Sequence, residues 1–120
     1  MTFESGRIYR LVAKDGAGLT CDAEGVALGG VPLAWARQGA DGAPKWQARP
    51  RDEVADILGV AYGVQQAAVV DRCHRGLRRI ASQLEKGDVA LAGIEALMLR
   101  LPPIDPDRMA KLAAVEFRKG

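Results

Sequence analysis

An acid, a thiol and an imidazole lie close together in the chain, at Asp71, Cys73 and His74. These residue types can supply the carboxylate, the nucleophile and the base of nucleophilic catalysis. Neighbouring residues on a helix diverge by about 100° around its axis, so Cys73 and His74 should point in different directions. Cys73 also falls within an apolar stripe, where a thiol packs as a small hydrophobic group. We therefore expect a core cysteine and a boundary histidine here, and the sequence predicts no enzyme.

Cations recur at helical spacing in the same segment, at Arg72, Arg75, Arg79 and Lys86. Arg78 and Ser82 flank them. Such a face can bind phosphates, which makes these four cations candidate contacts for a nucleic acid or a partner. A solvated outer face, or one paired with acids elsewhere in the chain, produces the same pattern. No aromatic residues are interleaved with the cations, and no helix-turn-helix signature accompanies them, so nucleic-acid binding is the less favoured function.

Glu95 is the one acid in the apolar run 89–101, which Arg100 also interrupts. A buried carboxylate must be paired, hydrogen-bonded or neutralised. Arg72 and Arg75 on the preceding helix are its expected partners. A structural ion pair is favoured over a general base.

The sequence contains no signature of a cofactor or metal site, so we expect no cofactor. Gly25, Gly29 and Gly30 lack the lysine and the following helix of a phosphate loop. The two cysteines, Cys21 and Cys73, match no metal-ligand spacing. A disulfide between them is left open, although ordinary thiols in a reducing cytosol are favoured.

Size and composition indicate one ordinary globular domain, spanning residues 1–120. The 120 residues are 48% hydrophobic and 27% charged, and the formal net charge is only +2. A charge so small does not by itself imply a polyanionic partner. No apolar run approaches the roughly 20 residues of a membrane span, and no leader-like segment begins the chain. We expect a soluble, cytoplasmic protein that does not contact a membrane.

Residues 1–49 have the composition of strands and turns. Apolar segments separated by turn residues such as Asp15-Gly16 predict a small antiparallel sheet. Its expected strands are 8–13, 19–22, 26–28, 31–36 and 45–48. Pro32 predicts that the fourth of these is an edge or irregular strand, and Trp46 is expected to anchor the last.

Residues 50–120 have helical periodicity instead. Pro50 and Gly63 suit the start and the end of a first helix. A second helix is predicted over 70–86, with an apolar stripe at Val70, Cys73, Leu77, Ile80, Ala81 and Leu84. Gly87 ends it, and Asp88 caps the next helix so soon that the two must form a hairpin.

The run 89–101 is apolar almost all round, which is typical of a helix buried on several sides. We expect it to be the central helix and the hairpin 70–101 to hold the most buried positions. Asp105 should cap a last helix. The sequence thus predicts an α+β fold in which a small N-terminal antiparallel sheet precedes about four helices with a central helical hairpin.

Several segments resemble a family of uncharacterised bacterial proteins. The resemblance rests on Tyr62-Gly63, the Gly87-Asp88 joint and Leu101-Pro102, with further likeness upstream at Val31-Pro32 and Arg49-Pro50. It covers roughly residues 20 to 105. Some members of that family continue into toxin-like domains, and this chain ends at Gly120 without such a continuation. The resemblance implies a module that presents or packages something else, and it carries over no catalytic residue.

These observations predict a non-catalytic protein-interaction module. It would be an adaptor, or a small protein of a prophage or other mobile element, that binds a partner protein of unknown identity. A homodimer through the helices is a further expectation, because the hairpin is more apolar than a domain of this size needs. The alternative is a nucleic-acid-binding protein that uses Arg72, Arg75, Arg79 and Lys86.

Overall fold

The computed structural model describes residues 9–10, 19–21, 25–64 and 66–115 of the chain. The described strands are β1 (Tyr9–Arg10), β2 (Leu19–Cys21), β3 (Gly25–Leu28), β4 (Val31–Gln38) and β5 (Pro44–Ala48). The helices that follow are α1 (Arg51–Tyr62), α2 (Ala67–Glu85), α3 (Val89–Met98) and α4 (Pro106–Ala114). The predicted α+β architecture is confirmed, although most of the expected strand 8–13 lies outside the described residues.

The sheet is an antiparallel meander in which each strand pairs with the next, in the order β1-β2-β3-β4-β5. β4 therefore lies between β3 and β5, so of the two predicted alternatives, an edge or an irregular strand, it is not the edge strand. The expected irregularity is present, because the β3–β4 register shifts opposite Pro32. β5 ends at Ala48, which pairs with Ala34, so Pro32 lies beyond the β4–β5 ladder. A proline fits there because no ladder bond to β5 requires its missing N–H.

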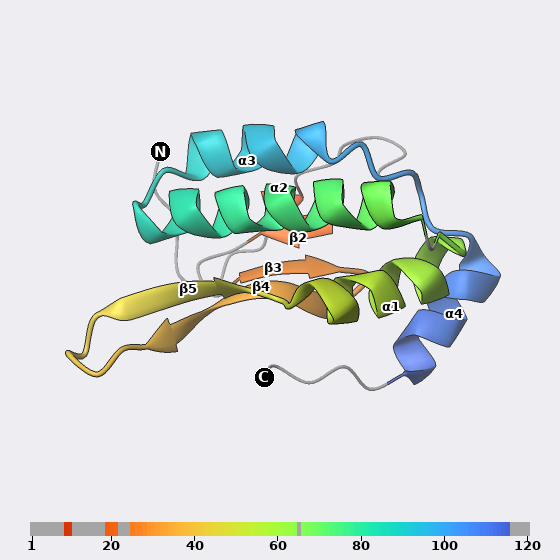
Figure 1. Ribbon diagram of the computed structural model, residues 1–120, viewed down its shortest axis with the longest axis horizontal. Coiled ribbons are helices and arrows are strands. Elements are labelled where there is room, and N and C mark those ends of the chain that lie inside the picture. The colour runs from red at the N-terminus through yellow and green to blue at the C-terminus, as the bar shows by residue number, and fades with distance from the viewer. Residues whose placement is uncertain (1–8, 11–18, 22–24, 65, 116–120) are drawn as a thin grey trace.

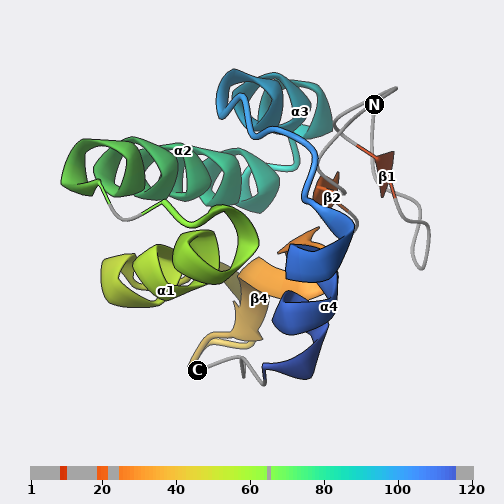
Figure 2. The same cartoon turned by 90° about the vertical axis from the view of Figure 1, so that its right-hand side faces the viewer.

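α2 occupies the middle of the helical part. It packs against α3 on one side and against β4 and β5 on the other (Figure 1). Figure 2 shows α1 on another side of α2, with α4 beside α1. Every member of the predicted stripe is buried, namely Val70, Cys73, Leu77, Ile80, Ala81 and Leu84. The central helix of the fold is therefore α2.

α3 is an outer helix, and the prediction that the run 89–101 forms the buried central helix is wrong. Leu91, Ile94, Leu97 and Met98 are 44%, 53%, 54% and 61% exposed. Within the helix, the small residues Ala92 and Ala96 are buried against the rest of the fold. Leu99, just beyond the end of the helix, is also buried. Gly76 of α2 permits this close packing, because a Cβ atom there would overlap the Leu99 side chain. The apolar pattern of α3 thus includes one face that nothing in the described part of the chain covers.

The joints between helices follow the predicted local signals. α1 begins directly after Pro50 and ends at Gly63, which has φ +71°. In the hairpin, Gly87 has φ +78°, and the Asp88 carboxylate accepts a hydrogen bond of 3.0 Å from the Leu91 amide. A positive φ is readily adopted only by glycine, so these two residues fix where α1 and α2 end.

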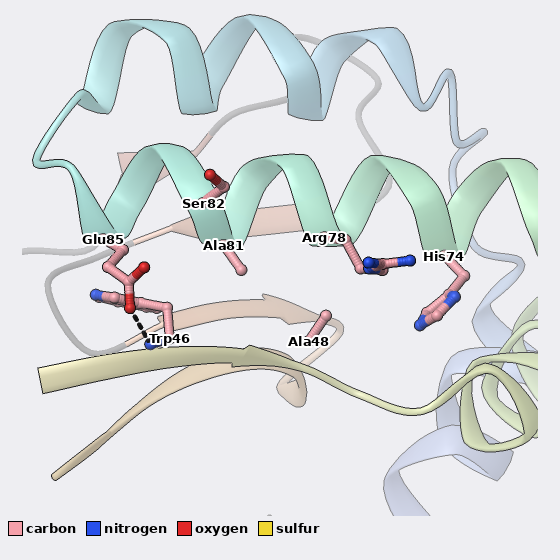
Figure 3. Close-up of a pocket in the computed structure, with 7 residues that line it drawn as sticks. All are labelled: Trp46, Ala48, His74, Arg78, Ala81, Ser82 and Glu85. Atoms are coloured by element: carbon pink, nitrogen blue, oxygen red, sulfur yellow. Dashed lines mark hydrogen bonds between the residues drawn. The ribbon is translucent and has the colours of Figure 1, made fainter. Parts of the chain in front are cut away.

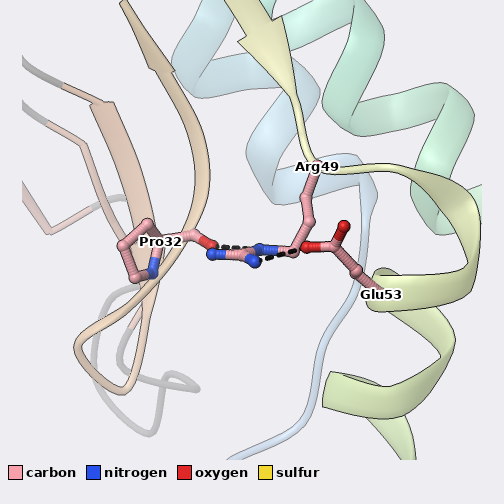
Figure 4. Close-up of polar contacts among 3 residues, drawn as sticks. All are labelled: Pro32, Arg49 and Glu53. Atoms are coloured by element: carbon pink, nitrogen blue, oxygen red, sulfur yellow. Dashed lines mark hydrogen bonds and ion pairs between the residues drawn. The ribbon is translucent and has the colours of Figure 1, made fainter. Parts of the chain in front are cut away.

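One buried arginine joins the sheet to α1. The Arg49 side chain is 1% exposed, and its Nε donates a 2.7 Å hydrogen bond to the Pro32 carbonyl. Its Nη1 lies 2.7 Å from the Glu53 carboxylate (Figure 4). Its guanidinium lies 5.1 Å from the Trp35 ring centroid. The charge is therefore compensated within the fold by a carbonyl, a carboxylate and a ring face. No sequence pattern predicted this structural role of Arg49.

Candidate functional site

The first candidate surface is the outer face of α3, which we call the apolar patch. It consists of Leu91, Ile94, Leu97 and Met98. Leu91, Ile94 and Met98 are spaced three and four residues apart, so they form one stripe along the helix, with Leu97 at its side. No charged residue interrupts this stripe, and the nearby acid Glu95 is turned toward α2 and paired there. The face is suited to contact with another apolar surface.

The second candidate surface is a basic hollow of about 330 Å³ on the outer side of α2, lined by Arg75, Arg78, Arg79 and Ser82. Of the four predicted contact cations, only Arg75 and Arg79 line it; Arg72 and Lys86 are exposed elsewhere on the helix. Arg78 and Ser82, predicted only to flank those cations, are part of the hollow. Arg75, Arg78 and Ser82 are spaced three and four residues apart along α2, so their side chains lie on the same face.

Glu95 forms the expected ion pair, but with a different arginine. Arg79 Nε lies 2.9 Å from the Glu95 carboxylate, so the prediction of Arg72 or Arg75 as the partner is wrong. The pair links α2 to α3. It also neutralises part of the charge beside the basic hollow and leaves Arg75 and Arg78 as its less compensated cations.

A third surface feature is an open groove of about 320 Å³ between β5 and α2, which we call the edge groove. Its lining includes Ala48, His74, Arg78, Ala81 and Ser82, with Trp46 and Glu85 at one end (Figure 3). The Glu85 carboxylate accepts a 3.3 Å hydrogen bond from the Trp46 amide. Arg78 and Ser82 line both this groove and the basic hollow, so the two form one continuous surface.

Sequence reasoning missed the edge groove because it depends on which face of α2 meets β5. Those two elements are separated by α1, and periodicity does not specify how they pack. The available signal was a tryptophan in the last predicted strand. Trp46 was expected to anchor that strand, and it is only partly buried because it borders the groove.

The Asp71, Cys73 and His74 side chains do not form a catalytic arrangement. Asp71 is paired with Arg51 of α1, which holds the pKa of its carboxyl below the usual value. Burial lowers the pKa of His74, and Arg78 and Arg51 lower it further. Burial raises the pKa of the Cys73 thiol to about 11, and this cysteine is free. A protonated thiol inside the core is a poor nucleophile. The predicted core position of Cys73 is confirmed, because it is 5% exposed.

The raised pKa of Cys73 predicts a pH dependence of stability. The unfolded chain loses the thiol proton near its ordinary pKa of 9.0, before the folded chain does at about 11. The contribution of this group to stability is therefore complete below about pH 9 and is lost as the pH rises towards 11. Urea unfolding between pH 8 and about pH 10.5 should show a steeper loss of free energy for the parent than for Cys73→Ala. Parallel profiles would contradict the assignment.

Among the described residues, no group of three or more histidine, cysteine or acidic side chains is placed to hold a metal ion. No helix in the described part of the chain has the length and hydrophobicity needed to cross a bilayer.

Comparisons of this chain with protein-family models, curated proteins and solved structures give no match. The resemblance to an uncharacterised bacterial family therefore stays a prediction. The apolar patch, the basic hollow and the edge groove are the surface features that bear on function.

Proposed function

We propose that this protein is a non-catalytic protein-interaction module whose docking surface is the apolar patch of α3. The observation that supports this proposal is the exposure of Leu91, Ile94, Leu97 and Met98 on one face of an outer helix. The module would act as an adaptor in the cytoplasm, or as a small mobile-element protein that binds a partner protein. A second copy of the chain is one form that this partner can take.

The free energy of solvent exposure supports the proposal. Burying a leucine, isoleucine or methionine side chain is worth about 1.5–3 kcal/mol, and the patch forgoes a large part of this at four positions. Surface helices usually carry polar residues on the outer side. A contiguous exposed apolar face is characteristic of an interaction surface, and this spacing fits a helix docked in an apolar groove.

Site-specific photo-crosslinking tests the proposal. A photoreactive side chain at Ile94 should give a defined crosslinked product in the cells that make the protein. The same group at Ala110, an exposed position of α4, should not. A product of twice the 12.8 kDa chain mass identifies a second copy, and any other mass identifies a different protein.

A second variant shows whether that product depends on the patch. Leu91→Glu should abolish the crosslink from Ile94 while leaving the fold intact, because Leu91 is 44% exposed. Crosslinks of equal yield at Ile94 and Ala110, or a product unaffected by Leu91→Glu, would overturn the proposal.

A further inference from the structure

We infer that the edge groove binds an extended acidic segment of another polypeptide, which adds a strand to the free edge of β5. This site lies between β5 and α2 and is separate from the apolar patch of α3. The inference therefore goes beyond the function proposed above and does not depend on it.

The free edge of β5 carries backbone groups that are directed into the groove. β5 is the last strand of the sheet and pairs only with β4 among the described strands. The Trp46 amide donates to Glu85, and the Arg49 amide donates to the Leu33 carbonyl of β4, so the backbone groups of Trp46 and Ala48 point away from the ladder. The Trp46 carbonyl and the Ala48 amide have no hydrogen-bond partner among the described residues.

These two groups have the spacing that strand addition needs. In a parallel ladder, a residue that lies opposite residue i of the neighbouring strand donates to the carbonyl of residue i−1 and accepts from the amide of residue i+1. A residue placed opposite Gln47 can therefore bond to Trp46 and Ala48 together. Main-chain bonds of this kind supply affinity when a peptide adds to a sheet edge. The other end of the edge is closed to this pairing, because Pro44 has no amide hydrogen and Glu85 caps Trp46.

The charges beside the groove favour an acidic occupant. Arg78 lines the groove itself, and Arg75 and Arg79 lie beside it in the basic hollow. Only Arg79 of these three forms an ion pair with a described residue. Burial is the main cause of the lowered pKa of His74, and Arg78 lowers it further. A carboxylate on the added strand would pair with Arg78 through a charge-assisted hydrogen bond.

The same features favour a peptide over a nucleic acid. Single strands bind through cations that follow the backbone and through aromatic rings on which bases stack. Among the described residues, the groove lining includes a single aromatic side chain, Trp46, so it offers no series of rings on which successive bases could stack. Lys86 and Arg72, which would extend a phosphate track, do not line the hollow.

Titration of the full chain with a labelled peptide of alternating glutamate and valine tests the inference, with fluorescence anisotropy as the readout. Arg78→Glu should weaken binding about tenfold or more, because it removes the groove cation. Arg72→Glu is the matched control: it changes the net charge equally, on the same helix, outside the groove. It should change the affinity by less than about threefold, through long-range charge alone.

Two further measurements separate strand addition from general charge attraction, and a third separates this site from the apolar patch. The peptide should slow hydrogen exchange of the Ala48 amide, and an analogue methylated at alternate backbone nitrogens should bind much more weakly. Ile94→Glu should leave peptide binding unchanged, so failure of the apolar patch and failure of this site are distinguishable. Four outcomes would each overturn the inference. They are no peptide binding at low salt, equal losses of affinity in Arg72→Glu and Arg78→Glu, undiminished binding of the methylated analogue, and tighter binding of oligothymidine than of the peptide.

Discussion

Replacing Arg49 with methionine should lower the free energy of unfolding by about 2–4 kcal/mol. The guanidinium donates to the Pro32 carbonyl at 2.7 Å and to the Glu53 carboxylate at 2.7 Å, and both bonds are charge-assisted. Methionine fills much of the same volume but cannot donate a hydrogen bond, so the Pro32 carbonyl loses its partner. The contact with the Trp35 ring is also lost. Urea unfolding monitored by circular dichroism measures the change.

Two further variants define the source of that loss. Arg37→Met removes an exposed arginine of β4 that donates a 2.9 Å hydrogen bond to the Gln47 side-chain oxygen. It should lower the free energy of unfolding by less than about 0.5 kcal/mol. Arg49→Lys keeps the charge but loses the planar fork that reaches two acceptors, so its stability should be intermediate. Equal losses in Arg37→Met and Arg49→Met would contradict a structural role for the buried arginine.

Local signals in the sequence predicted most of the helical architecture. Pro50 and Gly63 flank α1, and Gly87 and Asp88 form the joint of the hairpin, as expected. Each of these signals depends on the conformation of one or two residues, which the residue type itself restricts. All six residues of the predicted α2 stripe are buried, because an apolar face repeats with a clear 3.6-residue period. Gly76, which is also buried in α2, was not predicted to belong to this face.

Features that depend on contacts between distant residues could not be predicted in the same way. An apolar pattern shows that a face of a helix is hydrophobic, but it does not show what covers that face. The sequence therefore placed α3 at the centre, while the structure leaves Ile94 and Met98 exposed. The partner of Glu95 depends on the angle between α2 and α3, and it is Arg79 rather than Arg72 or Arg75.

The candidate surfaces were also predicted only where local patterns specify them. The sequence identified a basic helix face, and two of its four cations do line the basic hollow. It did not identify the edge groove, because β5 and α2 meet only through tertiary packing. The role of Arg49 was missed for a related reason, since its carbonyl partner at Pro32 lies in another strand.

α2 is the buried central helix and α3 is an outer helix. The same substitution should therefore lower the free energy of unfolding by very different amounts on the two helices. Leu77→Ala in α2 should lower the free energy of unfolding by about 2–5 kcal/mol, because Leu77 is 0% exposed and its loss leaves a cavity. Leu97→Ala in α3 should cost less than about 1 kcal/mol, because its side chain is 54% exposed. Urea unfolding of both variants at low protein concentration, where any self-association is minimal, provides the comparison.

This pair of variants tests the architecture directly. If α3 were the buried centre of the domain, as its composition alone suggests, Leu97→Ala would cost as much as Leu77→Ala. A small cost at Leu97 that grows with protein concentration would instead show that the apolar patch is buried against a second copy, because stability that depends on association follows mass action. The concentration dependence therefore separates what α3 contributes within one chain from what its outer face contributes between chains.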